Sequence, residues 1–294
     1  MADDFRLDRR RLKQQFDTAA ASCDAVDALS RAIGEQMDAR LNGIVHTPQQ
    51  VLDLGCGTGR DLAALARRYP EARLTAVDLS PAMVARIPHP RGLMARLTGR
   101  RRAPQRVAAH AEALPFARGQ FDLLWSNLML NWLDDPTAAV DEMHRVMRVG
   151  GMLMFATLGP DTLKELRAAL NDTQAAHVHR FIDMHDIGDA LVRAGFGDPV
   201  MDMETLTLTY TDFDALVADL RQSGSTNASI ARPRGLGNRA RWQRARAHYE
   251  TLRRDGRLPA TFEVVYGHAW KPAPKTLDDG RAVIKFQPRP ATPT

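Results

Sequence analysis

Apolar residues recur along this chain with two different spacings. From residue 8 to residue 42 they follow the turns of a helix, without an intervening proline, at Leu12, Phe16, Ala19, Ala20, Cys23, Val26, Leu29, Ile33, Met37 and Leu41. From Val51 to Thr157, short apolar runs alternate with helix-like segments, which is the pattern of a parallel sheet with crossover helices. We therefore predict a helical N-terminal cap over residues 1–46 and an α/β core over residues 47–210.

The rest of the pattern predicts the end of this core. A helix from Ile182 to Ala194 should stop at Gly195, because glycine ends helices in the left-handed conformation. Apolar residues then alternate with threonines up to Tyr210, as in a half-buried strand. Residues 261–270 are rich in β-branched and aromatic side chains, and we expect them to close the sheet as an antiparallel strand.

Two further segments lie outside this pattern. Residues 211–260 are too many for a simple connection between two strands, so a helical insertion is expected there. After Lys271 the prolines predict a loose tail over residues 271–294, with one short strand at 282–286.

A glycine-rich turn follows the first strand of the core. The apolar run 51–54 leads into three alternate glycines, and a helix-like segment over 60–68 follows them: Gly55, Gly57 and Gly59. Glycine permits a backbone with positive φ, and it lets a ligand lie against main chain whose first helical N–H groups are unpaired. The sequence predicts a ligand-binding turn at this edge of the sheet.

An acidic residue suggests which ligand binds there. Asp78 ends the strand-like run 74–77, about 20 residues after the glycines, the position from which an acid reaches ribose hydroxyls in nucleotide-binding α/β folds. The turn has neither the Gly-x-Gly-x-x-Gly pattern that holds a pyrophosphate nor the Lys-Ser/Thr pair of kinase-type loops. We therefore expect a nucleoside ligand without phosphates.

Length and composition are those of a single enzyme with one large core. The chain has 294 residues, of which 44% are hydrophobic. No stretch approaches the roughly 20 apolar residues of a membrane span, and acids stand at the N-terminus where a signal peptide carries basic residues. We expect a cytoplasmic protein without a membrane span. Cys23 and Cys56 lack the partners of a disulfide framework or zinc site, so both are expected to be reduced and no metal is expected.

Arginines are concentrated in two segments. Residues 86–106 hold seven arginines and no acid, and residues 229–257 hold nine arginines against two acids, whereas the whole chain has a net charge of +5. A basic surface can attract nucleic acid, an anionic membrane or an acidic protein, and it can also be an ordinary solvated face. Aromatic residues are only 6% of the chain and are not interleaved with these arginines, which argues against nucleic acid. An acidic carrier protein is our preferred partner.

Four motifs in order resemble the class I S-adenosylmethionine-dependent methyltransferases: 53–59 with the glycines, 77–83 with Asp78, 111–116, and 121–127. The resemblance implies a Rossmann-like, seven-stranded sheet and S-adenosyl-L-methionine as cofactor. It implies cofactor contacts from Asp53, Gly55, Gly57, Gly59, Asp78, Met83, His110, Ala111 and Asn127. His110 stands where this class usually presents an aspartate to the adenine amino group.

A closer resemblance covers most of the chain. Residues 121–132, 155–166, 177–181 and 256–267 look like the malonyl-acyl-carrier-protein O-methyltransferases of biotin synthesis. The same segments are also similar to a mitochondrial complex I assembly factor that hydroxylates protein arginines. Cys23 departs from the biotin family, which often has tyrosine there. We interpret the chain as a methyltransferase acting on malonyl-acyl-carrier protein. The alternatives are a small-molecule O- or C-methyltransferase of quinone or polyketide type, an arginine-modifying assembly factor, and a protein that binds the cofactor without turnover.

The expected chemistry limits which residues must act. A malonyl carboxylate is ionised at neutral pH, so its methylation needs no general base and no catalytic residue is assigned. We predict substrate contacts from Asn127, Trp132 and Arg180, with the Arg180 guanidinium holding the carboxylate. His144, His177 and His179 are interpreted as packed or solvated side chains.

Overall fold

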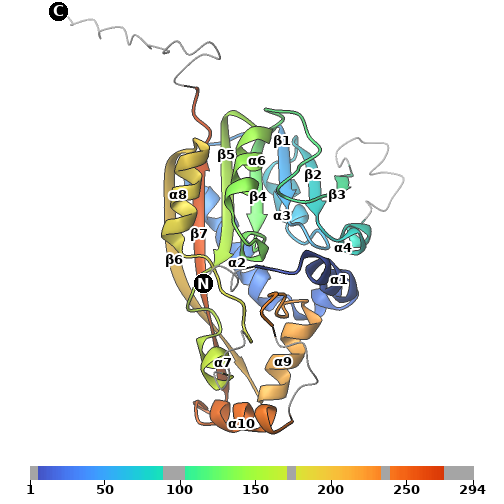
Figure 1. Cartoon of the computed structure of the whole chain (residues 1–294). Helices are drawn as coiled ribbons and strands as arrows, with labels where there is room; N and C mark the ends of the chain where they lie inside the picture. The colour runs from blue at the N-terminus through green and yellow to red at the C-terminus, as the bar shows by residue number, and fades with distance from the viewer. Residues whose placement is uncertain (1–5, 89–102, 171–176, 233–238, 275–294) are drawn as a thin grey trace, which may run out of the picture.

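The computed structural model describes residues 6–88, 103–170, 177–232 and 239–274. It contains a seven-stranded sheet in the order β3-β2-β1-β4-β5-β7-β6 (Figure 1). The first five strands run parallel, and β7 lies antiparallel between β5 and β6. The fold class and the antiparallel last strand expected from the sequence are confirmed. The strands are β1 (Gln50–Leu54), β2 (Arg73–Asp78), β3 (Gln105–Ala108), β4 (Phe121–Asn127), β5 (Met147–Leu158), β6 (Gly197–Tyr210) and β7 (Leu258–Trp270).

Two layers of helices pack on the sheet. Along β5, Met152, Met154 and Ala156 join one apolar cluster, whereas Leu153 and Phe155 join another, because successive side chains point to opposite faces of a strand. The first cluster contains residues of α2 (Ala28–Arg40) and α3 (Leu62–Arg68), and the second contains residues of α6 (Thr137–Val146) and α8 (Met184–Ala194). The sheet is therefore covered on both faces, as its near-continuous apolar strands require.

The N-terminal cap is helical, but its helix is interrupted. The helical spacing continues through residues 20–27, whereas the structure has α1 (Arg9–Ala19), a 3₁₀ turn η2 (Cys23–Val26) and then α2. At the break, the Ser22 hydroxyl donates to the carbonyl oxygens of Ala19 (3.3 Å) and of Gln222 in the insertion (2.9 Å). The break lets α1 pack against α4 (Pro81–Arg86) while α2 packs on the sheet.

The two C-terminal strands are longer than their sequence patterns indicate. β6 begins at Gly197, although residues 197–205 show no β-like alternation, and β7 begins at Leu258 rather than at residue 261. Pairing between β6 and β7 runs from Gly197 with Trp270 to Tyr210 with Leu258. This tertiary pairing extends both strands beyond the rest of the sheet and carries the insertion (Figure 1).

The insertion packs as a small helical subdomain around that extended hairpin. Its helices are α9 (Phe213–Gln222) and α10 (Arg239–Glu250), and α7 (Lys164–Ala169), which follows β5, lies against α10 (Figure 1). Phe213, Leu216, Ala245 and Tyr249 are buried there. The helical insertion predicted before the last strand is confirmed.

Some sequence predictions fall outside the described residues. Most of the arginine segment 86–106 lies in 89–102, and the short strand expected at 282–286 lies in the tail. Within the part of the chain that is described, no helix combines the length and the apolar character needed to cross a bilayer.

Candidate active site

A cavity of about 490 Å³ opens at the carboxyl ends of β1, β2 and β4 and continues under the insertion. Ligands of open α/β sheets bind at this edge. One part of the wall is formed by the glycine turn and the residues after β2, β3 and β4. The other part is apolar and comes from α7, α9, α10 and the extended hairpin: Leu166, Leu208, Val217, Leu220, Trp242 and Phe262.

The glycine turn has the geometry that its sequence predicts. Gly55, Gly57 and Gly59 all have positive φ, at 80°, 54° and 85°. A Cβ on Gly55 would lie 2.5 Å from the Met129 Cβ, whereas a Cβ on Gly57 would meet nothing within 4 Å. Gly55 is therefore needed for packing. Gly57 lines the cavity and leaves room for a ligand against bare main chain.

Asp78 lines the cavity at the end of β2 and organises the turn. Its carboxylate accepts hydrogen bonds from the main-chain N–H groups of Gly57 (2.9 Å) and Ser80 (2.8 Å). Burial raises the pKa of this carboxyl, against the lowering effect of those two bonds. Asp78 therefore joins the two motifs that the sequence placed about 20 residues apart.

Two other predicted residues hold buried acceptor atoms without partners. Asp53 is 2% exposed and lies beneath the turn rather than in the cavity wall, and its Oδ2 atom accepts no hydrogen bond from the described residues. Burial, followed by the charge of Asp61, raises the pKa of Asp53 well above its usual value. Asn127 lines the cavity, and its Oδ1 atom is likewise buried and unpaired.

Asp61 explains how Asn127 is held, and sequence reasoning missed it. Its carboxylate accepts from Trp125 Nε1 (3.0 Å), Asn127 Nδ2 (2.9 Å) and Arg60 Nε (3.1 Å). Asn127 Nδ2 also donates to the Ser30 carbonyl oxygen in α2 (3.0 Å). These bonds set the amide orientation, so Oδ1 is the atom left for a ligand. The signal in the sequence was an acid directly after the glycine turn, at the start of a predicted helix.

The remaining predicted cofactor residues lie around the same space. Met83, His110 and Ala111 line the cavity, and Gly59 does not. A Cβ on Gly59 would lie 2.8 Å from the Leu62 Cδ1 atom, so this glycine serves the packing of the turn. Cys23 also lines the cavity, where burial raises the pKa of its thiol to about 11 and keeps it protonated.

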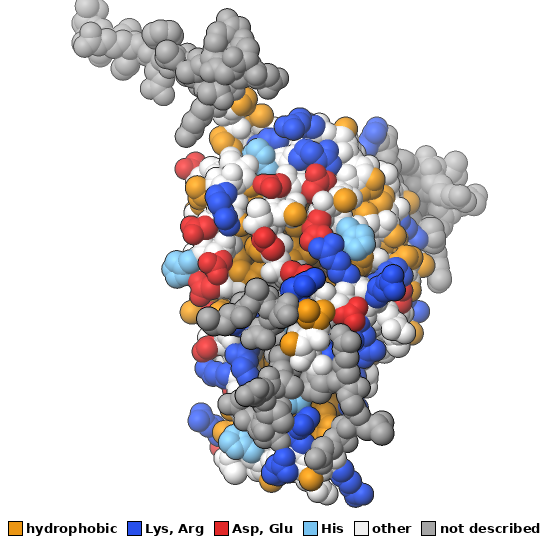
Figure 2. All heavy atoms as spheres, in the orientation of Figure 1, with side chains coloured by type: hydrophobic (Ala, Val, Ile, Leu, Met, Phe, Trp, Pro, Cys, Tyr) orange, Lys and Arg blue, Asp and Glu red, His pale blue; other side chains and the backbone are white. Residues whose placement is uncertain are grey.

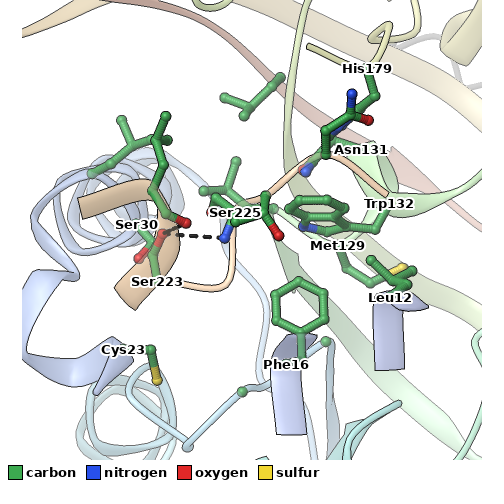
Figure 3. Close-up of a pocket in the computed structure, with 18 of the residues that line it drawn as sticks. Leu12, Phe16, Cys23, Ser30, Met129, Asn131, Trp132, His179, Ser223 and Ser225 are labelled. Carbon is green, nitrogen blue, oxygen red and sulfur yellow. Dashed lines mark hydrogen bonds between the residues drawn. The ribbon is translucent and has the colours of Figure 1, made fainter. Parts of the chain in front are cut away.

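The predicted substrate residues separate in the structure. Trp132 lines the cavity, and its ring lies 5.1 Å from the Phe16 ring of α1 in a perpendicular arrangement (Figure 3). Arg180, by contrast, is exposed and does not line the cavity, so it is not positioned there to hold a substrate carboxylate. Its neighbours His179 and Phe181 are buried and line the wall instead, and the half-buried His177 and Val178 line it as well.

These residues fit S-adenosylmethionine. Asp78 offers a carboxylate in the cavity wall for a ribose, and Gly57 leaves open space beside it. The Asn127 Oδ1 atom, which has no partner among the described residues, is an acceptor suited to the ammonium group at the amino-acid end of the cofactor. A buried acceptor without a partner costs about 1–3 kcal/mol, and such a donor would remove that cost.

Comparisons with known proteins show the family of this chain. The Methyltransferase domain family, Methyltransf_11, matches residues 52–155. The chain is 51% identical to the malonyl-[acyl-carrier protein] O-methyltransferase of Laribacter hongkongensis over 98% of this chain and 99% of that protein. It is 47% identical to the enzyme of the same name from Methylovorus sp. over 100% and 99%. The YcgJ protein of Bacillus subtilis shares the fold, with a TM-score of 0.56, 17% identity, and coverage of 82% of this chain and 100% of that one.

The fold, the glycine turn and the acid after β2 define a class I S-adenosylmethionine-dependent methyltransferase. The chain is similar over nearly its full length to two enzymes of the same name, and this similarity identifies a family within that class. The chain belongs to the malonyl-[acyl-carrier protein] O-methyltransferase family.

Proposed function

We propose that this protein transfers the methyl group of S-adenosylmethionine to the free carboxylate of malonyl-acyl-carrier protein, forming its methyl ester for biotin synthesis. The observation that carries the proposal is that the similarity extends over 98% of the chain. It therefore includes α7, α9 and α10, which lie outside the common methyltransferase domain at residues 52–155. Those helices form the wall of the cavity that faces the acceptor.

This reaction requires the protein to align the carboxylate oxygen with the methyl group, and it requires no proton transfer. When bound, the cofactor supplies an electrophilic methyl group on a sulfonium, and its acceptance by a carboxylate oxygen releases no proton. The cavity wall agrees, because the Cys23 thiol stays protonated and the pKa of His179 is lowered to about 4 by burial. Phe16 and Trp132 exclude water, which strengthens the attraction between a carboxylate and a sulfonium.

A cation is needed to hold the malonyl carboxylate, and the cavity offers a different arginine from the one predicted. Of the arginines in the described wall, Arg9 is paired with Glu112 and Arg60 with Asp61. Arg221, at the end of α9, lines the cavity without an acid beside it among the described residues. Our choice for this role is Arg221.

This choice predicts a contrast between two arginines. Arg221→Gln should raise KM for malonyl thioesters about tenfold or more, because hydrogen bonds to a charged group are worth about 1.5–3 kcal/mol. Arg180→Gln should leave KM unchanged, and steady-state kinetics compare the two. A raised KM in Arg180→Gln with an unchanged KM in Arg221→Gln would instead assign the carboxylate contact to Arg180.

We propose that the carrier protein docks on the exposed face of α10. Trp242 of this helix lines the cavity and Tyr249 is buried, whereas Arg239, Arg244 and Arg246 are exposed. Figure 2 shows blue side chains at the end of the molecule where α10 lies. Arg246 already pairs with Asp214 (2.5 Å). A carrier bound to this face would sit over the apolar part of the cavity, so its thioester would have a short path inward.

A product measurement tests the proposed function. Malonyl-acyl-carrier protein incubated with the enzyme and isotope-labelled S-adenosylmethionine should gain one labelled methyl ester, seen by mass spectrometry and removed by mild base. The gene should also restore growth of a biotin-requiring strain that lacks this activity. Cofactor binding by calorimetry without any ester, or label on arginine-containing proteins instead, would contradict the proposal.

A further inference from the structure

His179 presents an unpaired buried nitrogen in the wall of the cavity. The residue is 6% exposed, and its ring lies 4.9 Å from the Trp132 ring and 4.6 Å from the Phe181 ring. It bonds to the Asn131 main chain, and its Nε2 atom has no partner among the described residues. Figure 3 shows His179 beside Asn131 and Trp132, on the same side of the cavity as Phe16.

The surroundings decide which ring nitrogen carries the proton. Burial, and the positive charge of Arg167, lower the pKa of His179 to about 4, so the ring is neutral at physiological pH. The bond to the Asn131 carbonyl needs an N–H donor, and Nε2 is not part of it, so Nδ1 carries the proton. Nε2 is then an acceptor with a free lone pair.

A hydrogen-bond acceptor at this place can bind only a part of the substrate that carries a donor. A carboxylate or a thioester carbonyl brings only acceptor atoms and would face the Nε2 lone pair unfavourably. A secondary amide brings an N–H donor, and the arm that holds an acyl group on a carrier protein has an amide a short way from its sulfur. An alcohol or an amine could also donate, but the proposed substrate class places an amide N–H nearest the reacting end.

We infer that Nε2 of His179 accepts a hydrogen bond from the first amide N–H of the thioester arm, so the cavity recognises amide-bearing thioesters and not only the malonyl group. This inference rests on the proposed function. In this role His179 determines substrate specificity through a direct contact, whereas a histidine that only packs against Trp132 would not. The contact would place the thioester between the cofactor site and the apolar wall.

The test compares two small substrates that differ in one atom. Malonyl-N-acetylcysteamine carries the amide, and the thioester with an ester oxygen in place of that N–H does not. Unsubstituted protein should show KM about tenfold lower for the amide, the usual worth of one hydrogen bond. His179→Phe keeps the ring between Trp132 and Phe181 but removes Nε2, so it should raise KM for the amide about tenfold and leave the ester unchanged. His179→Gln, which puts an amide near the same point, should recover part of the preference.

The controls separate recognition from folding. His185→Phe makes the same substitution on α8 at a side chain that is 85% exposed, and it should leave both KM values unchanged. Thermal unfolding and cofactor titration of each variant check the fold. Equal KM for the two substrates in the unsubstituted protein, or equal loss on both in His179→Phe, would overturn this inference alone. Failure of the unsubstituted protein to methylate malonyl-acyl-carrier protein would overturn the proposed function and this inference with it.

Discussion

At the scale of single residues, buried polar atoms without partners mark the site. Asn127 Oδ1 and His179 Nε2 are buried, have no partner among the described residues, and belong to residues of the cavity wall, whereas Asp53 Oδ2 and the Tyr266 hydroxyl are equally unpartnered but belong to residues outside that wall. Each costs the folded protein about 1–3 kcal/mol unless a ligand brings a donor. In the cavity wall a bound ligand could supply that donor. Two predictions belong to this scale, one for Asp78 and one for His179.

Asp78→Ala should weaken S-adenosylmethionine binding by about 1.5–3 kcal/mol, the range for hydrogen bonds to a charged group. The same substitution frees the Gly57 N–H, so the turn should also lose order. Asp78→Asn keeps one acceptor oxygen, so its affinity for the cofactor should lie between those of the unsubstituted protein and Asp78→Ala. Calorimetric titration measures the affinity, and an unchanged Kd for Asp78→Ala would mean that the ribose lies elsewhere.

His179 should make the protein less stable in acid. Its pKa is about 4 when folded against 6.5 when free, so the unfolded chain binds more protons between these values. Stability due to the neutral ring is complete above pH 6.5 and is lost as pH falls toward 4. From pH 7 to pH 4.5 the free energy of unfolding should fall by about 2 kcal/mol more in the parent than in His179→Phe. Urea unfolding at both pH values measures this, and parallel losses would contradict the assigned pKa.

At the scale of elements, α2 is pressed against the residues that orient the site. A Cβ on Gly34 would lie 2.9 Å from Asp61 Oδ1 and 3.1 Å from Asn127 Nδ2. The Asp61 carboxylate cannot easily move away, because Trp125, Asn127 and Arg60 all donate to it. We therefore propose that the N-terminal cap holds Asn127 in place for the cofactor in addition to covering the site.

Gly34→Val should accordingly damage both stability and cofactor binding. Overpacking of this kind costs about 1–3 kcal/mol, which should lower Tm by several degrees and weaken cofactor binding. Gly43→Val is the matched control, because its added Cβ meets nothing within 4 Å. Equal effects of the two substitutions on cofactor affinity would show that α2 does not position Asn127.

At the scale of the whole molecule, several arginines of residues 229–257 make ion pairs within the chain. Arg232 pairs with Asp8, Arg246 with Asp214 and Arg253 with Glu250. Arg239 and Arg244 lie exposed on the helix that forms the outer wall of the cavity. Reversing Arg246 would break its ion pair with Asp214, so the docking test leaves Arg246 unchanged.

Reversing charge at Arg239 and Arg244 together should raise KM for malonyl-acyl-carrier protein severalfold at low salt. The defect should shrink as salt rises, because ions screen attraction between exposed charges. Turnover of a malonyl thioester without carrier should stay the same. Glutamate at Arg67 and Arg193, which are exposed on other helices, is the control. An equal rise in KM for both substrates, or a defect that does not depend on salt, would mean that the arginines of α10 are only solvated and do not dock the carrier.

Local sequence was enough for the core of the site. Glycines at 55, 57 and 59 must adopt positive φ wherever the chain goes next, and an acid at the end of the second strand must lie at the same edge of a parallel sheet. The two periodicities likewise require helices on a parallel sheet, and so the class of fold. These properties depend on residues that are near one another in sequence or in adjacent strands.

Only the tertiary structure decided the acceptor side of the cavity. Asp61 acts through Trp125, Asn127 and α2, and β6 is extended by pairing with β7 rather than by its own residues. The same reason separates His179 from Arg180. Both residues belong to the motif 177–181. The His179 ring packs against Trp132 and Phe181 and is buried, whereas Arg180 is exposed. Which of two neighbouring side chains is buried depends on distant partners, and no local pattern in the sequence specifies those partners.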